Sequence, residues 1–446
     1  MNDDVLQFCR RDPGVAYLDA DLWLPLSEVP VRGIQQRLTF TMFSGRKRDI
    51  PTDIEIFSMA KHHIQVPRNL FTLKYVRHAY GIEIVDLRPS SYPSTTILHS
   101  IIPRDNQTEP LRLMEELGDG TLNLACGLGK TVVALYHAVR LGVPTLVICN
   151  NTTILAGWER EIIGKLDFEG KVGWVKQNKF PEDTPICLAT VQTLASKADV
   201  LPRSFLRRWG LVIFDEGHHM SANWFCTVAN LFPGKRLALT ATTTRNDGLE
   251  KVYQYHLGKV FYSDLSQDLE PEIEFVHLHG LRPAREYSED VALKNWIARN
   301  AEFNQVITEE VKTLLQEGRS ILALSHRVEQ LELLHPTLPG SGLIHGVIKD
   351  SAREEALSEA NPILATMQLA QEGLDKPSLD TLLCLTLFSN ENAFQQCVGR
   401  ILRTYEDKKH PRALFFVPDV RRCQKQAARI RRFAKMRGYK IKETRR

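Results

Sequence analysis

A glycine-rich stretch, ACGLGKT at 125 to 131, constrains the fold of this 446-residue chain more than any other feature. It follows the mostly apolar run Leu122 to Ala125, which predicts a buried strand that passes through a glycine turn into a helix. In such a turn, Gly127 and Gly129 allow backbone N–H groups to wrap around a phosphate. The stretch therefore predicts an α/β domain that binds a nucleotide.

Further residues fit the same phosphate chemistry. Lys130 is expected to reach the β- and γ-phosphates, and Thr131 to supply a hydroxyl to Mg²⁺. Asp215 ends the buried run Leu211 to Phe214 and is expected to hold the same metal. Glu216 is left to orient the attacking water. ATP and Mg²⁺ are therefore the expected cofactors.

A third string, QCVGRILR at 396 to 403, opens with Gln396 and carries Arg400 and Arg403. At i, i+3 spacing both arginines are expected on one helix face, where they can point at the γ-phosphate as arginine fingers. Each string alone has an ordinary structural explanation, but their order, strand context and chemistry agree. Together they predict an ATP-driven motor on nucleic acid, with Gln396 grouped among its catalytic residues.

The apolar runs divide the chain into three regions. Residues 1–95 hold short alternating runs bounded by Gly, Pro and Asp, which indicate a β-rich accessory domain. Residues 96–265 alternate strands with helices, and the continuous apolar strands are typical of a parallel sheet covered on both faces. Residues 266–446 repeat this pattern without a phosphate loop of their own.

Positive charge is concentrated at the end of the chain. Residues 421–446 hold twelve Lys or Arg and one acid, although the whole chain has a net charge of only +4. Ala427, Ile430, Phe433 and Ala434 recur at helical spacing. The segment is therefore expected to be a basic amphipathic helix packed on the last domain, with its cations turned to a polyanion.

The eight cysteines are scattered and include no C-x-x-C pair, and no long apolar stretch follows the acidic start of the chain. Reduced thiols are therefore expected in place of zinc or disulfides, and neither a signal peptide nor a membrane anchor. These features favour a cytoplasmic protein of a bacterial or phage-infected cell, with a nuclear location left open.

These three motifs, in this order along the chain, resemble those of superfamily 2 helicases. Within that superfamily they are most similar to the DExH branch, which includes the XPB-like helicases and the UvsW-like, phage-type helicases that remodel forks and migrate branches. The resemblance runs from about residue 100 to about residue 440. It implies an α/β fold with two tandem RecA-like parallel-sheet domains, preceded here by the small β-rich domain. Gln107 matches the glutamine that reads the adenine edge in this group.

The resemblance implies roles for further residues. Contact with the nucleic-acid backbone is implied for Thr190, Gln192, Arg327 and Thr366, nucleotide sensing for Gly373 and Asp375, and coupling of hydrolysis to strand movement for Thr240 and Thr242. The chain departs from the family at Leu124, where a small residue is usual, and at Thr243, where proline is usual. Neither departure removes a group that hydrolysis needs.

The first region contains a basic loop, Arg46, Lys47 and Arg48, which is expected to contact duplex. Further candidate contacts are Lys61, His62 and His63. The segment from Ile64 to Arg68 resembles the "PRG"-type strand end of phage and bacterial members of the group, with Asn69 in the glycine position. In such proteins a β-rich module engages duplex ahead of the motor.

The leading function is an ATP-dependent helicase or translocase that acts on forked, branched or duplex DNA, as a monomer on nucleic acid. An RNA helicase stays open, because motor motifs grip the phosphate backbone and read little of the sugar. An ATP-controlled duplex-binding switch without unwinding is a third possibility. A restriction motor is a fourth, and it would need a nuclease on another chain.

Overall fold

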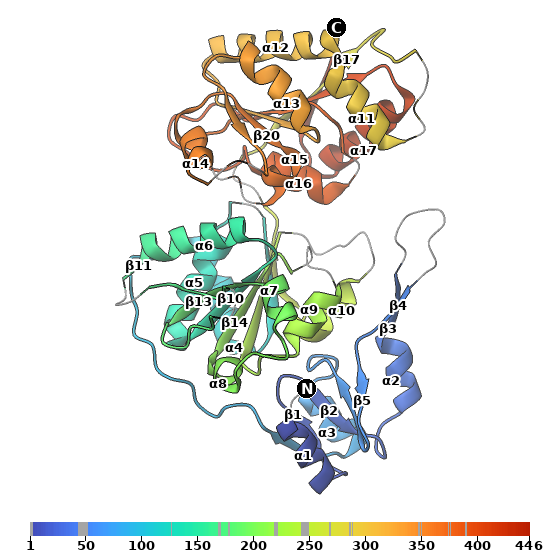
Figure 1. Cartoon of the computed structure of the whole chain (residues 1–446), viewed down its shortest axis with the longest axis vertical. Coiled ribbons are helices and arrows are strands. Elements are labelled where there is room, and N and C mark those ends of the chain that lie inside the picture. Colours follow the sequence, from blue (N-terminus) through green and yellow to red (C-terminus); the bar gives the residue numbers. More distant parts are fainter. Residues whose placement is uncertain are drawn as a thin grey trace. The chain divides into compact units, whose positions relative to one another are not determined.

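The computed structural model describes residues 3–42, 52–125, 127–167, 171–176, 179–217, 222–241, 249–266, 269–284, 287, 289–346, 348, 350–372, 374, 376–388 and 390–446. The chain divides into two compact units. The first consists of Met1–Leu124 and Gly129–Leu265, and the second of Ala125–Leu128 and Ser266–Arg446. Each unit contains a parallel sheet of seven strands (Figure 1), so the two predicted parallel sheets are confirmed.

The N-terminal module, residues 3–95, is β-rich as predicted, but it also contains helices that the sequence did not indicate. Its elements are α1 (Asp3–Arg11), β1 (Ala16–Leu18), β2 (Leu22–Pro25), α2 (Val31–Leu38), β3 (Thr39–Met42), β4 (Thr52–Glu55), β5 (Ser58–Met59), β6 (His63–Val66), α3 (Leu73–Tyr80) and β7 (Ile84–Asp86). Five strands form one sheet in the order β5-β6-β2-β1-β7, and β3 pairs with β4. All these pairs are antiparallel except β1–β7.

The first α/β domain follows at residues 96–265. Its elements are β8 (Leu98–His99), α4 (Asp105–Glu116), β9 (Gly120–Leu124), α5 (Lys130–Leu141), β10 (Thr145–Cys149), α6 (Thr152–Lys165), β11 (Leu166–Asp167), β12 (Gly173–Trp174), β13 (Ile186–Thr190), α7 (Val191–Ser196), α8 (Arg203–Arg208), β14 (Leu211–Asp215), α9 (Ala222–Ala229), β15 (Lys235–Thr240), α10 (Glu250–Leu257) and β16 (Val260–Asp264). The main sheet has the order β12-β13-β10-β14-β15-β9-β16. Its central strands β10 and β14 are buried at every position, because helices cover both faces of a parallel sheet.

The second α/β domain lies in residues 269–446. Its elements are β17 (Glu272–Leu278), α11 (Asp290–Arg299), α12 (Ala301–Gln316), β18 (Ile321–Ser325), α13 (Val328–Leu334), a 3₁₀ turn (His335–Thr337), β19 (Gly342–Ile344), α14 (Asp350–Glu359), β20 (Ile363–Thr366), α15 (Met367–Glu372), β21 (Thr381–Cys384), α16 (Glu391–Gly399), β22 (Arg412–Pro418), α17 (Arg421–Met436) and β23 (Lys440–Arg445). The sheet order is β19-β20-β18-β21-β22-β17-β23. The predicted basic helix is confirmed as α17, which buries Ala427, Ile430 and Ala434.

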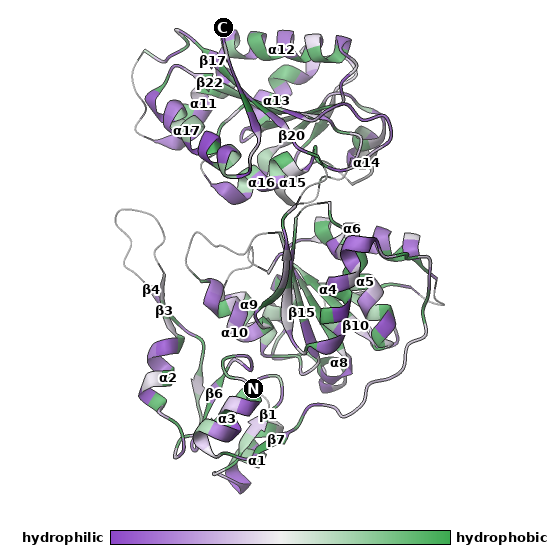
Figure 2. Cartoon of the chain, turned by 180° about the vertical axis from the view of Figure 1, so that it is seen from behind, coloured by the Kyte–Doolittle hydropathy of each residue, from purple (hydrophilic) through white to green (hydrophobic). Residues whose placement is uncertain are grey.

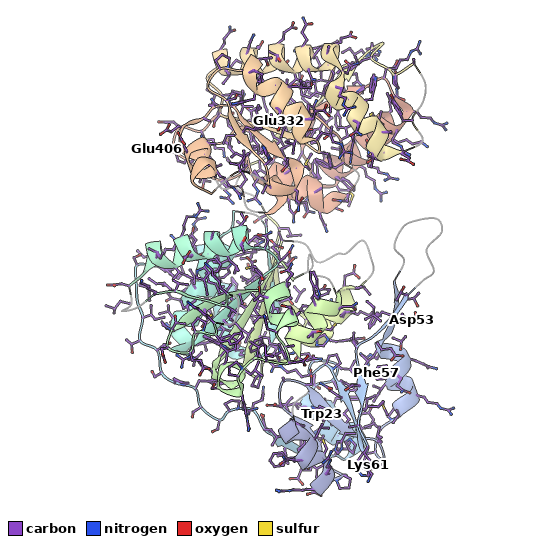
Figure 3. All side chains as sticks on the ribbon, in the orientation of Figure 1. Trp23, Asp53, Phe57, Lys61, Glu332 and Glu406 are labelled. Carbon is purple, nitrogen blue, oxygen red and sulfur yellow. The ribbon has the colours of Figure 1, made fainter. Side chains whose placement is uncertain are left out.

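The N-terminal module and the first α/β domain share one hydrophobic core. A single cluster of buried side chains joins Leu18 and Leu22 of the module to Phe205 and Trp209 of the domain. Figure 2 shows apolar residues in the strands of both parts of this unit. Figure 3 marks Trp23, which is buried in the module, and Lys61, which is exposed on it.

A buried ion pair crosses this junction. The Arg68 guanidinium contacts both carboxylate oxygens of Asp119, at 2.5 Å and 2.7 Å, and the two side chains are only 2% and 8% exposed. Asn69 donates to the same carboxylate at 2.9 Å and to the His256 carbonyl at 3.0 Å. The asparagine in the family's glycine position therefore adds two hydrogen bonds between the module and the domain.

A buried histidine on α5 makes the stability of this unit dependent on pH. His137 is 1% exposed, and burial, followed by the charge of Lys235, lowers its pKa to about 3. The unfolded chain takes up this proton below pH 6.5 and the folded chain does not, so stability is lost as the pH falls below 6.5. His137→Leu is therefore expected to reduce that loss by about 1.4 kcal/mol per pH unit. Urea unfolding at pH 7.5 and 5.5 measures the difference, and parallel pH profiles for the two proteins would contradict the assignment.

Within the described ranges, no helix combines the length and the apolar character that a membrane crossing requires.

Candidate functional site: strand-end residues of the two sheets

The predicted glycine turn joins β9 to α5. Gly127 and Gly129 have φ angles of +94° and +78°, a region that side chains with a Cβ rarely adopt. Gly129 caps the start of α5, and Lys130 is the first residue of that helix. The turn therefore depends on both glycines, whereas Leu124, the departure from the strict pattern, is a buried strand residue.

Gln107 lies against this turn. A Cβ added at Gly129 would lie 2.6 Å from Gln107 Nε2, so the glycine is also required for this close approach. Gln107 is 3% exposed, and its Oε1 accepts a hydrogen bond of 3.0 Å from the Arg104 backbone N–H at the start of α4. The structure thus brings together two predicted nucleotide-binding positions that are far apart in the sequence.

Two carboxylates and a lysine meet at the ends of the central strands. Lys130 Nζ donates to Glu216 Oε1 at 2.8 Å, and both side chains are mostly buried. Asp215 is the last residue of β14, is 7% exposed, and accepts a hydrogen bond of 2.8 Å from Trp158 Nε1. Thr131 follows Lys130 in the first turn of α5 and is half-buried.

The charge at this site favours a cation. Burial and then the neighbouring Glu216 carboxylate raise the pKa of Asp215 to about 6, although Lys130 and Trp158 oppose the shift. Two carboxylates with one lysine leave a net negative charge when both acids are ionised. Carboxylate and hydroxyl oxygens are the ligands that Mg²⁺ prefers, so Asp215 and Thr131 fit the group that the sequence implied.

Glu216 has an unusual backbone conformation. Its φ angle is +50°, in the left-handed region, directly after β14 ends. Its N–H donates to the Leu239 carbonyl of β15 at 2.9 Å. A residue with a Cβ in this region costs about 1–3 kcal/mol, and such conformations cluster at functional sites. The surrounding sheet therefore holds the Glu216 carboxylate in place at the expense of local stability.

Other predicted residues of the first unit lie at neighbouring strand ends. Thr190 ends β13 and caps α7, with its hydroxyl accepting from Thr193 N–H at 3.2 Å. Gln192 donates to the Asn150 carbonyl at 2.8 Å and so ties α7 to the end of β10. Thr240 ends β15, the strand between β14 and β9, and is 6% exposed. Thr242 and Thr243 lie outside the described residues.

In the second unit, Thr366 ends β20 and Arg327 follows β18. Arg327 precedes α13; its backbone N–H donates to Ser325 Oγ at 3.0 Å and its Nη2 to the Val291 carbonyl at 3.4 Å. Both residues are half-buried. Gly373 and Asp375 fall in positions that the structure does not describe.

The prediction that Arg400 and Arg403 lie one turn apart on the same helix is wrong. Helix α16 ends at Gly399, and Arg400 is its cap. Beyond that point the N–H groups of residues 400 to 402 reach back only three residues, to the carbonyls of residues 397 to 399. The chain thus leaves the helix through a tight turn, and Arg403 lies beyond it. Gln396 is in α16 and 3% exposed.

The candidate duplex contacts of the N-terminal module have different environments. Lys61 is exposed and His62 is half-buried. His63 is fully buried, with Nε2 2.7 Å from the Val15 carbonyl, so the prediction that it contacts duplex is wrong. It belongs to β6, whose residues face the core of the module. Arg46, Lys47 and Arg48 are not among the described residues.

Two structurally important residues were not recognised from the sequence. The resemblance implies contact with the nucleic-acid backbone for the segment Thr145 to Trp158, whereas the Trp158 indole N–H donates to Asp215 Oδ2 at 2.8 Å. For Arg68 the sequence indicates only a resemblance to a strand-end motif, whereas in the structure it pairs with Asp119 at 2.5 Å. Neither partner is near in sequence, so only the folded arrangement identifies these pairs.

Comparison with known proteins agrees with this arrangement. The family model of the type III restriction enzyme res subunit matches residues 98–245, and the helicase conserved C-terminal domain matches residues 303–405. A protein of Acanthamoeba polyphaga mimivirus that is named as a putative ATP-dependent RNA helicase is 28% identical to this chain. The alignment covers 67% of this chain and 60% of that protein. A protein of Escherichia phage T5 that is named as a probable helicase is also 28% identical. The alignment covers 68% of this chain and 69% of the phage protein.

The DNA 3′–5′ helicase XPB of Mycobacterium tuberculosis is 27% identical over 65% of this chain and 56% of its own length. The match therefore spans little more than half of that relative. Among solved structures, Saccharomyces cerevisiae Dbp5 bound to RNA and ADP BeF3 superposes with a TM-score of 0.58 at 14% identity. That alignment covers 77% of this chain and 90% of Dbp5, and it shows a common fold. The two family matches, one in each α/β domain, and the named relatives support a superfamily 2 helicase related to the phage and XPB types.

Proposed function

We propose that the chain hydrolyses ATP to move along, unwind or remodel nucleic acid, with forked or branched DNA as its substrate. The observation that carries this proposal is the meeting of Lys130, Glu216 and Asp215 at the end of β14. A nucleotide's phosphates would compete with Glu216 for the Lys130 ammonium group. Glu216 Oε1 would then be available to accept a hydrogen bond from water.

Each residue of this site has a proposed task. Lys130 and the N–H groups of the glycine turn bind phosphate, and Gln107 contacts the base. Asp215 and Thr131 hold Mg²⁺, which when bound neutralises charge on the phosphates. Trp158 keeps the Asp215 carboxylate in place through its N–H. The roles of Arg400, Arg403, Gln396, Gly373 and Asp375 rest on the resemblance and stay predictions, as do the nucleic-acid contacts of Thr190, Gln192, Arg327 and Thr366.

The names of the relatives divide between DNA and RNA helicases. We choose DNA because of the N-terminal module: it is fixed to the motor through a shared core, and a basic loop follows β3 in the sequence. A module fixed in this way can hold duplex beside a motor whose own contacts are sequence-neutral.

The test is the rate of ATP hydrolysis with matched single-stranded, duplex, forked and four-way DNA, and with the same set in RNA. We expect the strongest stimulation, together with strand displacement, on forked or four-way DNA. Equal or stronger stimulation by RNA would replace the DNA assignment with an RNA helicase. ATP-dependent duplex binding without displacement would favour a binding switch, and no stimulation by any nucleic acid would reject the proposed motor.

A further inference from the structure

Helix α17 separates the cations of the chain's last segment into two sets. Its apolar face, Cys423, Ala427, Ile430 and Ala434, is buried in the core of the second unit. The helix contains no acidic residue. A cation of this helix can therefore form an ion pair only with an acid on a neighbouring element, and its position around the helix determines whether such an acid is in reach.

The first set of cations makes contacts within the unit. Arg431 lies 2.6 Å from a Glu443 oxygen of β23 and 4.8 Å from the centre of the Phe275 ring. Arg422 lies 3.8 Å from Asp290 at the start of α11. On β23, Lys440 and Lys442 pair with acids of the adjacent strand β17. These cations have a structural role.

The second set of cations lies on the face of α17 that is opposite its buried apolar face. We name it the α17 stripe: Arg421, Lys425, Arg429, Arg432 and Lys435. All five are exposed, and the described part of the chain offers no ion-pair partner to any of them. The spacing of four, four, three and three residues keeps them on one face over about 21 Å of helix.

Helix stability does not explain the stripe. Like charges three or four residues apart destabilise a helix, and cations in the first turn oppose the helix dipole. Arg421 and Lys425 are like charges four residues apart, and Arg421 is also in the first turn. α17 is drawn mostly in purple in Figure 2, as expected from its hydrophilic outer face. The arrangement is therefore better explained by a polyanion that binds this face.

We propose that the α17 stripe binds the phosphate backbone of nucleic acid as a sequence-neutral anchor on the second unit. One strand of a duplex presents a phosphate about every 3.4 Å along its axis, so the stripe is long enough to follow about six of them. An anionic membrane is the less suitable partner, because a membrane-binding helix exposes an apolar face, whereas α17 buries its own. This inference rests on the proposed function and adds a surface for its substrate.

The test is the quadruple variant R421Q/K425Q/R429Q/R432Q of the full chain. Glutamine keeps the helix propensity, and the loss of like-charge repulsion should preserve folding. The matched control is R11Q/R282Q/K251Q/K312Q, which removes the same charge from exposed residues scattered over other parts of the chain. Binding to a short duplex and to the matching single strand is measured over a series of salt concentrations.

For the stripe variant we expect the slope of log affinity against log salt for duplex to become shallower by about 3.6, which is about 0.9 for each of the four charges removed. Affinity at low salt should fall by about tenfold or more, equally for unrelated sequences. ATP turnover at saturating DNA should be unchanged, and the control variant should keep the wild-type slope. If the quadruple variant does not fold, Arg421→Gln and Lys425→Gln are measured singly, each with an expected slope change of about 0.9.

The two proposals fail in different ways. A wild-type chain whose ATPase is not stimulated by any nucleic acid would reject the proposed function. Normal stimulation, with the wild-type salt slope kept in the stripe variant, would reject the stripe alone. A variant that lost binding to phosphatidylserine vesicles and kept its affinity for DNA would also overturn the stripe proposal, in favour of a membrane.

Discussion

Glu216→Gln is expected to lower ATP turnover by about 10²–10⁴ while ATP still binds. The amide keeps an oxygen that can accept from Lys130, which Glu216 contacts at 2.8 Å, but it cannot take up a proton from water. The phosphate-binding turn and Asp215 are untouched by the change. Steady-state turnover at saturating nucleic acid, together with equilibrium binding of a fluorescent ATP analogue, measures both properties.

Two further variants control this experiment. Glu332→Gln removes an exposed carboxylate on α13, marked in Figure 3, and should leave turnover unchanged. Lys130→Ala should weaken both ATP binding and turnover, because it removes a phosphate ligand. Near-normal turnover in Glu216→Gln would show that another group orients the water.

Asp119→Ala is expected to reduce the free energy of unfolding by about 3–5 kcal/mol, because it leaves the buried Arg68 guanidinium without its counter-charge. Burial alone would raise the pKa of Asp119, but the charge and hydrogen bonds of Arg68 outweigh burial and lower this pKa. After the substitution, the partners left to Arg68 among the described residues are the carbonyls of Pro233 at 2.8 Å and Gly234 at 2.6 Å. Urea unfolding of the full chain, followed by tryptophan fluorescence, measures the loss.

The matched control for this pair is Asp86→Ala. Asp86 and Arg88 form an ion pair of 2.6 Å, but the two side chains are 48% and 35% exposed. A pair this accessible to solvent contributes no more than about 1 kcal/mol. Equal effects of Asp86→Ala and Asp119→Ala would refute the special role of the buried pair.

The shared core also decides how the N-terminal module can be tested. Deleting residues 1–95 would uncover the apolar cluster that includes Phe205 and Trp209 and remove Arg68 from Asp119. Loss of activity in such a deletion would therefore report unfolding as well as substrate choice. Substitution of exposed residues, such as Lys61→Gln, leaves the core intact and is the better test of duplex contact.

The sequence predicts the centre of each sheet well, because burial on both faces selects continuous apolar runs. The run Leu211 to Phe214 is β14 almost to the residue, and Ile321 to Leu324 falls within β18. The glycine turn was equally predictable, since a positive φ restricts the residue type at Gly127 and Gly129.

Elements that depend on distant partners were not predictable. Strand β23 holds four charged residues among six, so no local pattern indicates a strand; its pairing with β17 creates it. The run Arg37 to Thr41 alternates polar and apolar side chains as a strand does, but α2 ends at Leu38 and β3 begins at Thr39. In the site, the Trp158–Asp215 and Gln107–Gly129 contacts join residues whose closeness depends on the whole sheet.

The position of β17 affects how the second unit folds during synthesis. Glu272 of this strand pairs with Arg412 on one side and with Lys440 on the other, so both neighbours are translated long after it. As the chain leaves the ribosome, β17 therefore has two unpaired edges until β22 and β23 emerge. The unpaired backbone N–H and C=O groups of such edges can form hydrogen bonds with strands of other chains, which leads to aggregation. Nascent chains stalled before residue 440 are expected to depend on chaperones, and slow translation over this stretch is expected to lower the yield of folded protein.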